Sequence, residues 1–444
     1  MGIDRAQRNL TGRTGALGRL TATMRRRERG QILVLTAMLL TVLLAFSGLL
    51  VDAGYLYAQR RQAQNAADQA ALAATRVLLE GGSTSSAIAA ALEYAEANGF
   101  DTNDSSTSVT VNIPPSSGEH VGDHTYAEVI IGEEPGTFFI HVLVTDGATV
   151  QARGVAGVNF HPEPYAVIVL DEDDCEAYDQ IGGAELTISG GSIMVNSNCQ
   201  PDALTNSGSG DLLVDGTIDV YGGYQVGGSG AVSPQPRSVP WTIGDPLAGI
   251  VPPTLGAPAP GSTGTAANPD TWRVTSGGGL TLYPGTYYGG FYSNCTCTIN
   301  MEPGVYIMAG GGFSKAGGTS FGGDGVMIYV TENPTNPTGD GAAEALSLTG
   351  SGVLDLSPPT SGPYENITLW QDAAITSDFI MRGSNDLAEG IFYVPGAELD
   401  FAGNTEGVSV QLIVKEFYIH GNSVFDIVYQ NYWDIQVPDA VLVE

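Results

Sequence analysis

Apolar and polar positions divide the chain into three regions that differ in period. The first region is an unbroken apolar run, residues 32–51, which begins with Ile32, ends with Val51 and holds no charged side chain. An α-helix rises about 1.5 Å per residue, so this run extends for about 30 Å, the thickness of the hydrocarbon core of a bilayer. The run therefore predicts a transmembrane anchor. A cleaved secretory signal is the alternative, although its apolar core is usually shorter and is followed by a small-residue cleavage site.

Helical periodicity continues past the apolar run. No proline or glycine lies between Gly54 and Gly81, so residues 31–80 are predicted to form the anchor and a continuing helix that ends near Leu79. Alanines recur at three- and four-residue steps and form one stripe: Ala63, Ala66, Ala67, Ala70, Ala73 and Ala74. The stripe would allow close packing against a partner helix or against the next element, or it reflects only the high helix propensity of alanine.

Residues 81–160 predict a small, pilin-like α+β module. The pattern of residues 85–98 is that of a short helix, which Gly99 would end as a C-terminal cap. Four segments that alternate or run apolar then predict strands at residues 108–113, 126–131, 137–144 and 149–156. Two helices followed by several strands indicate one α+β module.

From residue 161 onward, short apolar segments separated by glycines replace the helical pattern. Similar segments can be aligned so that Gly190 falls on Gly216, Tyr287 on Tyr306 and Asn404 on Asn422. These alignments predict that residues 161–444 form a right-handed parallel β-helix, a solenoid whose stacked coils bury a column of apolar side chains. A β-sandwich is the alternative. Residues 231–272 hold too much proline for ladder strands and predict a long loop on the outside of the solenoid.

The charge distribution gives the anchor a direction. The chain has 17 basic and 48 acidic residues, and eight of its arginines lie in residues 1–30 with only two acidic residues. Basic flanks of a membrane span stay in the cytoplasm. We therefore expect a single-pass cell-membrane protein with residues 1–30 as a basic cytoplasmic tail and the acidic remainder outside, in the periplasm or the medium. The acidity also argues against a nucleic-acid partner.

The four cysteines all fall on the predicted outer side, where disulfides are permitted. Cys175 and Cys199 form a plausible local disulfide. Cys295 and Cys297 would share one face of a strand, where a direct bond is geometrically awkward, so they could pair, stay reduced or bridge elsewhere. The four thiols do not have the spacing of a metal site, and no cofactor is expected.

Two clusters carry the remaining candidate chemistry. The acidic run Asp171, Glu172, Asp173 and Asp174 follows an apolar strand and is either a Ca²⁺ site or a solvated turn. An aromatic cluster is either a sugar-stacking patch or a ladder within the solenoid: Tyr283, Tyr287, Tyr288, Phe291, Tyr292 and Tyr306. Basic residues are too scattered for a uronate lyase, and no motif of a nucleophilic or phosphate-binding enzyme occurs.

Three motifs resemble the N-terminal module of the TadG-like Flp (tight adherence) pilus-assembly family. They are RERGQ at residues 27–31, VDAGY at residues 51–55 and QAQNAADQAALA at residues 62–73. Glycine-rich stretches between about residues 180 and 430, such as PGVYIMAGG at residues 303–311, are similar to the C-terminal regions of TadG-related envelope proteins. The resemblance implies a non-catalytic membrane protein associated with pilus or secretion machinery through its anchor helix.

The resemblance also bears on processing. Type IV prepilins carry a glutamate shortly after a cleavable glycine, whereas here Leu35 follows Gly30 at that spacing. This departure favours a permanent anchor. The sequence thus predicts an envelope protein of pilus assembly or surface adhesion, with the solenoid as a spacer or contact surface. The alternative is a membrane-tethered β-helix that acts on or binds carbohydrate, which would make surface glycans a further candidate partner.

Overall fold

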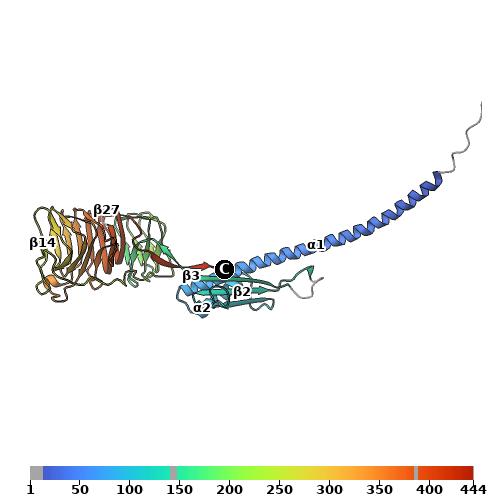
Figure 1. Ribbon diagram of the computed structural model, residues 1–444, viewed down its shortest axis with the longest axis horizontal. Coiled ribbons are helices and arrows are strands. Elements are labelled where there is room, and N and C mark those ends of the chain that lie inside the picture. The colour runs from blue at the N-terminus through green and yellow to red at the C-terminus, as the bar shows by residue number, and fades with distance from the viewer. Residues whose placement is uncertain (1–13, 141–147, 385–388, 444) are drawn as a thin grey trace, which may run out of the picture. The chain divides into compact units, whose positions relative to one another are not determined.

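The computed structural model describes residues 14–140, 148–384 and 389–443 (Figure 1). The chain divides into two compact units. The first contains Met1–Asn159 and Ala440–Glu444, and the second contains Phe160–Asp439. The sequence pattern placed the last residues with the coils. In the structure the final segment returns to the first unit, where the Val443 amide donates to the Val155 carbonyl at 2.9 Å. In sequence, the second unit is therefore an insertion in the first.

The first unit joins a long helix to a small α+β module. Helix α1 (Thr14–Leu79) ends where the sequence predicted, but it begins at Thr14, so residues 14–30, assigned to a tail, continue the helix. Residues 1–13 of that tail lie outside the described residues. Helix α2 (Thr84–Ala97) starts with Ser83 as its cap and is followed by Gly99 at φ +95°. Four strands form a sheet in the order β1-β2-β3-β29: β1 (Thr107–Asn112), β2 (Tyr126–Glu133), β3 (Val150–Glu163) and β29 (Ile435–Leu442).

The alanine stripe packs inside this module. Six α1 alanines are fully buried: Ala63, Ala66, Ala67, Ala70, Ala71 and Ala74. They share one core with Ala87, Ala91 and Ala95 of α2 and with apolar residues of β2. The sheet comes so close that a Cβ added at Gly154 would lie 2.7 Å from the Ala67 carbonyl carbon. Five of the six predicted stripe alanines therefore pack against the next elements and are not exposed to a partner helix, whereas Ala73 is only half-buried and Ala71 joins the buried set.

The second unit is a β-solenoid of about 12 turns. Each coil supplies up to three short strands, and the strands stack in parallel columns. The first column contains β16 (Gly285–Tyr288), β19 (Gly304–Ala309), β22 (Val326–Thr331), β25 (Ile367–Gln371), β4 (Tyr165–Val169), β7 (Ser192–Val195), β10 (Ile218–Val220) and β13 (Arg237–Ser238).

The second and third columns complete each coil. The second contains β14 (Trp272–Val274), β17 (Phe291–Asn294), β20 (Phe313–Ala316), β23 (Leu346–Gly350), β26 (Phe379–Ser384), β5 (Tyr178–Gln180), β8 (Leu204–Asn206) and β11 (Tyr224–Val226). The third contains β15 (Leu280–Leu282), β18 (Thr298–Met301), β21 (Ser320–Gly323), β24 (Leu354–Leu356), β28 (Val424–Val428), β6 (Glu185–Ser189), β9 (Leu212–Val214) and β12 (Val232–Ser233). The solenoid prediction is confirmed, and the β-sandwich alternative is wrong.

The repeat alignment was right for one pair of segments and shifted for the others. Leu186 lies opposite Leu212, as the alignment of Gly190 with Gly216 requires. In contrast, Gly285 lies opposite Tyr306, and Asn404 lies opposite Val424. Each of these two shifts is an even number of residues. Because side chains alternate along a strand, an even shift keeps the same residues facing inward.

The coils are not stacked in the order of the sequence. The chain enters at β4, winds through β7 and β10 to β13, and then crosses to β14 at the opposite end of the stack. It winds back until the long strand β27 (Glu389–Ile419) pairs with β4 and β5, so the last coils rest on the first. Figure 1 shows β14 at the outer end and β27 closer to the middle of the stack. A short 3₁₀ turn, η2 (Gly339–Gly341), interrupts one connection.

The prediction of a loop for residues 231–272 is wrong at its start, where Val232–Ser233 and Arg237–Ser238 pair as the ladder strands β12 and β13. The remainder of this proline-rich segment makes the crossing. We call residues 239–259 the strap. Side chains from successive coils hold it along the outer face of the first column: Asn196 to Ile243, Tyr393 to Asp245, Tyr364 to Val251 and Tyr288 to Gly256. Ile243 and Leu247 of the strap pack with Ile168, Tyr329 and Trp370. This cover explains why β4, β22 and β25 are buried on both faces.

Candidate functional site

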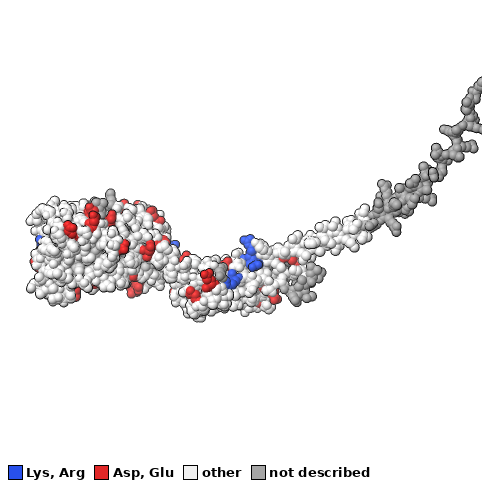
Figure 2. Space-filling model, viewed as in Figure 1, with Lys and Arg blue, Asp and Glu red and all other residues white. Residues whose placement is uncertain are grey.

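The apolar run forms an uncovered surface on α1. Of its side chains, Leu33 and Leu50 are each 72% exposed and Phe46 is 63% exposed. The helix is long and apolar enough to cross a membrane, by length and composition. Figure 2 shows this stretch of α1 without charged side chains. An apolar surface of this extent is unfavourable in water and requires a lipid or protein environment.

The run ends at a buried carboxylate. Asp52 is fully buried, although it lies on the helix that carries the exposed run. Its Oδ1 accepts a hydrogen bond from the amide of Phe138 at 3.0 Å, and its Oδ2 accepts from the amides of Phe139 and Ile140 at 2.7 and 2.6 Å. Three charge-assisted bonds compensate the burial of the carboxylate. Asp52 therefore fixes the segment that follows β2 against the C-terminal end of the apolar run.

Aromatic contacts complete this attachment, which we call the Asp52 clamp: Asp52 with Thr137, Phe138, Phe139 and Ile140. A Cβ added at Gly48 would lie 2.7 Å from Cγ of Phe139, so the ring rests directly on the helix backbone. The Phe138 ring meets Tyr55 edge-on, with centroids 5.8 Å apart. The strand predicted at residues 137–144 is wrong for residues 137–140, because Asp52 accepts the amides a sheet would use. Residues 141–144 lie outside the described residues.

A known protein family matches the stretch of the chain that contains the apolar run, Asp52 and the alanine-packed helices. Residues 30–91 match the Tad family, described as "Putative Flp pilus-assembly TadE/G-like". This part of the chain is therefore similar to the Tad family. No curated protein and no solved structure matches the chain. The resemblance noted for the N-terminal motifs is therefore confirmed, whereas the solenoid lies outside the residues that match the Tad family.

The acidic run that follows β4 forms a turn with its own counter-charge. Oxygens of Asp171, Asp174 and Glu416 converge within 4.8 Å of one another. The Lys415 ammonium lies among them, 3.0 Å from Asp171 and 3.5 Å from Asp174. Burial raises the pKa of Asp171, but the amides of Asp174 and Asp173 and the Lys415 ammonium outweigh it and lower that pKa overall. A Ca²⁺ ion would have to displace Lys415, so this geometry favours the solvated turn.

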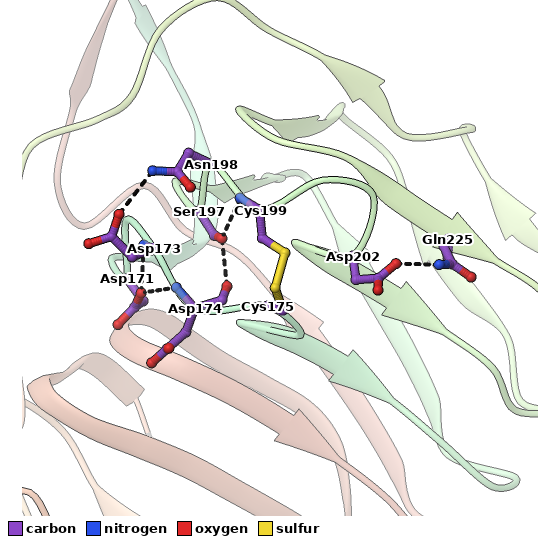
Figure 3. Close-up of a disulfide and its surroundings, with 9 residues drawn as sticks. All are labelled: Asp171, Asp173, Asp174, Cys175, Ser197, Asn198, Cys199, Asp202 and Gln225. Atoms are coloured by element: carbon purple, nitrogen blue, oxygen red, sulfur yellow. Dashed lines mark hydrogen bonds between the residues drawn. A yellow bond between two sulfur atoms is a disulfide. The ribbon is translucent and has the colours of Figure 1, made fainter.

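A disulfide joins this turn to the next coil (Figure 3). Cys175 and Cys199 are bonded, with their Cα atoms 5.2 Å apart. Beside it, the Asn198 amide nitrogen donates to the Glu172 carbonyl at 2.8 Å, and the Asn198 side chain donates to Asp173 at 2.9 Å. The second pair, Cys295 and Cys297, which the sequence left open, is also joined. The acidic turn and its neighbour are thus fixed by covalent and polar contacts.

The aromatic cluster is mostly internal. Tyr287, Phe291 and Tyr306 are at most 1% exposed, and the rings of Tyr287 and Tyr306 stack at 6.0 Å. Each of these tyrosines donates to a carbonyl four residues earlier. The ladder interpretation therefore holds for these three residues. Tyr292 instead faces a groove of about 690 Å³ on the outer face of the second column. There the Arg273 guanidinium lies 5.0 Å from its ring centroid.

An outward row of carboxylates beside this groove predicts a dependence of stability on pH. Burial, together with Asp378, Glu416, Asp400 and Asp179, raises the pKa of Glu398 to about 7. Between the ordinary pKa of about 4.5 and 7, the folded protein holds a proton that the unfolded chain releases, so stability falls as pH rises.

Glu398→Gln is therefore expected to stabilise the solenoid by roughly 1–2 kcal/mol at pH 8 and to have little effect at pH 4. Tryptophan fluorescence during unfolding measures this, because all four tryptophans lie in the second unit. Glu185→Gln, at an exposed site on β6, is the control. The same difference in stability between Glu398→Gln and wild type at pH 4 and at pH 8 would contradict the raised pKa of Glu398.

Proposed function

We propose that this protein is a single-pass, membrane-anchored envelope protein that supports assembly of the Flp pilus and has no catalytic role. The observation that carries the proposal is the coincidence of the Tad match over residues 30–91 with the uncovered apolar run of α1. The arginines of residues 1–30 keep the N-terminus in the cytoplasm, and the acidic solenoid lies outside as a spacer or contact surface. The anchor is permanent, since Leu35 replaces the acidic residue of prepilins.

Partner contacts are proposed for the exposed part of the anchor. The alanine stripe is buried within its own module, so a partner helix would meet residues 32–51 instead. Leu43 and Leu44 lie near the middle of this run and are 55% and 63% exposed. Introducing arginine at both positions would place two charges at the bilayer centre, each at a cost of about 3 kcal/mol.

Recovery of pilus-assembly components with the intact protein, from membranes in mild detergent, is the test. We expect co-purification with wild type and its loss in Leu43→Arg/Leu44→Arg, which should also leave the membrane fraction. The control is Val121→Arg at an exposed site of the α+β module. Recovery of no pilus component with wild type, or protection of the solenoid from protease added to spheroplasts, would overturn the proposal.

Carbohydrate recognition is the second candidate. Its support is the outer groove, in which the Tyr292 ring, Arg273, Glu344 and Asp378 could contact sugar hydroxyls and ring faces. A screen of the intact protein against neutral and acidic polysaccharides would separate binding from turnover. Turnover that is lost on Asp378→Asn would favour an enzyme over a pilus-assembly protein.

A further inference from the structure

The Asp52 clamp holds two large apolar side chains in the open. Phe138 is 67% exposed and Phe139 is 49% exposed, although both lie in an ordered turn. The residues around them are not a loose loop, because Asp52 fixes three consecutive amides. A buried carboxylate and a glycine on α1 thus position a pair of aromatic rings at a defined height beside the helix. Such exposure calls for an apolar partner.

Along the axis of α1, the two rings lie level with the C-terminal end of the apolar run, residues 32–51. Gly48, on which Phe139 rests, lies inside the apolar run, about 6 Å from Asp52 along the axis at 1.5 Å per residue. Tyr55, which Phe138 contacts, lies just beyond the run. The two rings therefore straddle the level where the hydrocarbon core gives way to headgroups. Aromatic side chains are enriched at this level of a bilayer.

Neighbouring side chains on α1 fit the same boundary. Tyr57 is 64% exposed, and the Arg61 guanidinium lies 6.0 Å from the centroid of its ring. Aromatic rings followed by cations that reach toward headgroups are typical of the polar side of a membrane interface. At the same height on α1, Leu50 and Val51 are 72% and 56% exposed. The apolar partner of the run is therefore also the partner of the rings.

We infer that Phe138 and Phe139 insert into the outer interface of the lipid bilayer, as a second membrane contact beside the helix. This inference rests on the proposed membrane anchoring of residues 32–51. The Asp52 clamp makes the contact rigid, so the α+β module is held at a fixed distance from the membrane surface instead of swinging on one helix. Burial of two aromatic rings adds modestly to the membrane affinity of a chain that a helix already anchors, so the contact matters for orientation more than for retention.

The test places a fluorophore on single cysteines in the full-length protein, reconstituted at one copy per nanodisc. The positions are Phe138→Cys, Val51→Cys and Tyr94→Cys. Val51 marks the end of the run, and Tyr94 is 51% exposed on α2. The native cysteines are paired in disulfides and do not label. Lipids with a nitroxide on the headgroup then quench probes at the interface.

We expect several-fold stronger quenching at positions 51 and 138 than at position 94. Quenching at 51 but not at 138 would overturn the inference and leave the anchor intact. Absence of quenching at both would instead overturn the proposed anchoring. A cysteine at position 138 that is protected from thiol reagents in native membranes but not in nanodiscs would assign the rings to a protein partner. This result would also overturn the inference.

A matched pair of variants tests the role of the helix backbone. Gly48→Leu must displace the Phe139 ring, whereas a Cβ at Gly54 meets nothing within 4 Å. Gly48→Leu should therefore reduce quenching at position 138, and Gly54→Leu should leave it unchanged. Equal quenching in both variants would show that the rings reach the lipid without the Asp52 clamp, and the inferred rigid contact would be wrong.

Discussion

Replacement of Glu128 by glutamine is expected to unfold much of the α+β module. Glu128 is fully buried in β2 and accepts hydrogen bonds from five donors. These come from Arg153 Nε at 2.6 Å, Ser116 Oγ and N at 2.6 and 3.0 Å, Ser117 Oγ at 2.7 Å and Asn112 Nδ2 at 2.8 Å. An amide would turn its own N–H groups toward these donors and leave Arg153 without its buried counter-charge. Losing one partner of a buried ion pair costs about 3–5 kcal/mol.

The same contacts predict the effect of acid. Burial raises the pKa of Glu128, but hydrogen bonds from Ser116 and Ser117 and from Arg153 outweigh it, so the pKa falls well below its ordinary value. The stabilisation is therefore present above the ordinary pKa of about 4.5 and is lost as pH falls below it. Glu128→Gln should lack this acid-dependent loss.

Hydrogen–deuterium exchange resolved by peptide measures both effects, because the module contains no tryptophan. Peptides of β1, β2 and β3 should exchange faster in Glu128→Gln at pH 7, while the solenoid stays protected. Glu119→Gln, at an exposed position in the connection between β1 and β2, is the matched control. If the β1, β2 and β3 peptides of Glu128→Gln exchange at the wild-type rate, the hydrogen bonds to Glu128 do not stabilise the module.

The second large effect is expected at the strap. Leu247 is 1% exposed and packs with the outer face of the first column, so Leu247→Ala removes buried surface and leaves a cavity that costs about 2–5 kcal/mol. Val251 lies on the same strap but is 74% exposed, and Val251→Ala should change stability by less than about 0.5 kcal/mol.

Limited proteolysis and tryptophan fluorescence report on this variant directly. Trp241 belongs to the strap and Trp370 lies beneath it, so detachment should shift the emission to longer wavelength and expose the strap to cleavage. Equal cleavage rates and equal emission wavelengths for Leu247→Ala and Val251→Ala would mean that burial of Leu247 does not hold the strap. Polar contacts, such as that of Asn196 with Ile243, would then hold it.

Local pattern predicted the elements well and their connections poorly. The apolar period of α1 indicated a helix that ends at Leu79, and the turn glycines indicated stacked coils. No local signal shows that β13 and β14 lie at opposite ends of the stack, because crossover length and proline content are compatible with any outside path. The nearly continuous apolar runs of β4 and β22 did contain a clue, since strands buried on both faces require a cover.

The Asp52 clamp was missed for a similar reason. The apolar run 137–144 was assigned to a strand because periodicity cannot separate a segment that pairs in a sheet from one that packs against a helix, as residues 138–140 do. Asp52 itself was the available signal. A single carboxylate directly after a membrane-like run must find donors if it is buried, and the sequence does not show which amides supply them.

The order in which the coils stack has a consequence for folding. Gln411 donates to the Tyr165 carbonyl, 246 residues earlier in the chain, and β28 pairs with β6. The coils that are synthesised first must therefore wait, with one face open, until almost the whole chain is available. Contacts so distant in sequence slow folding. A truncated chain cannot close the stack, because the strand that covers β4 and β5 comes from residues 389–419.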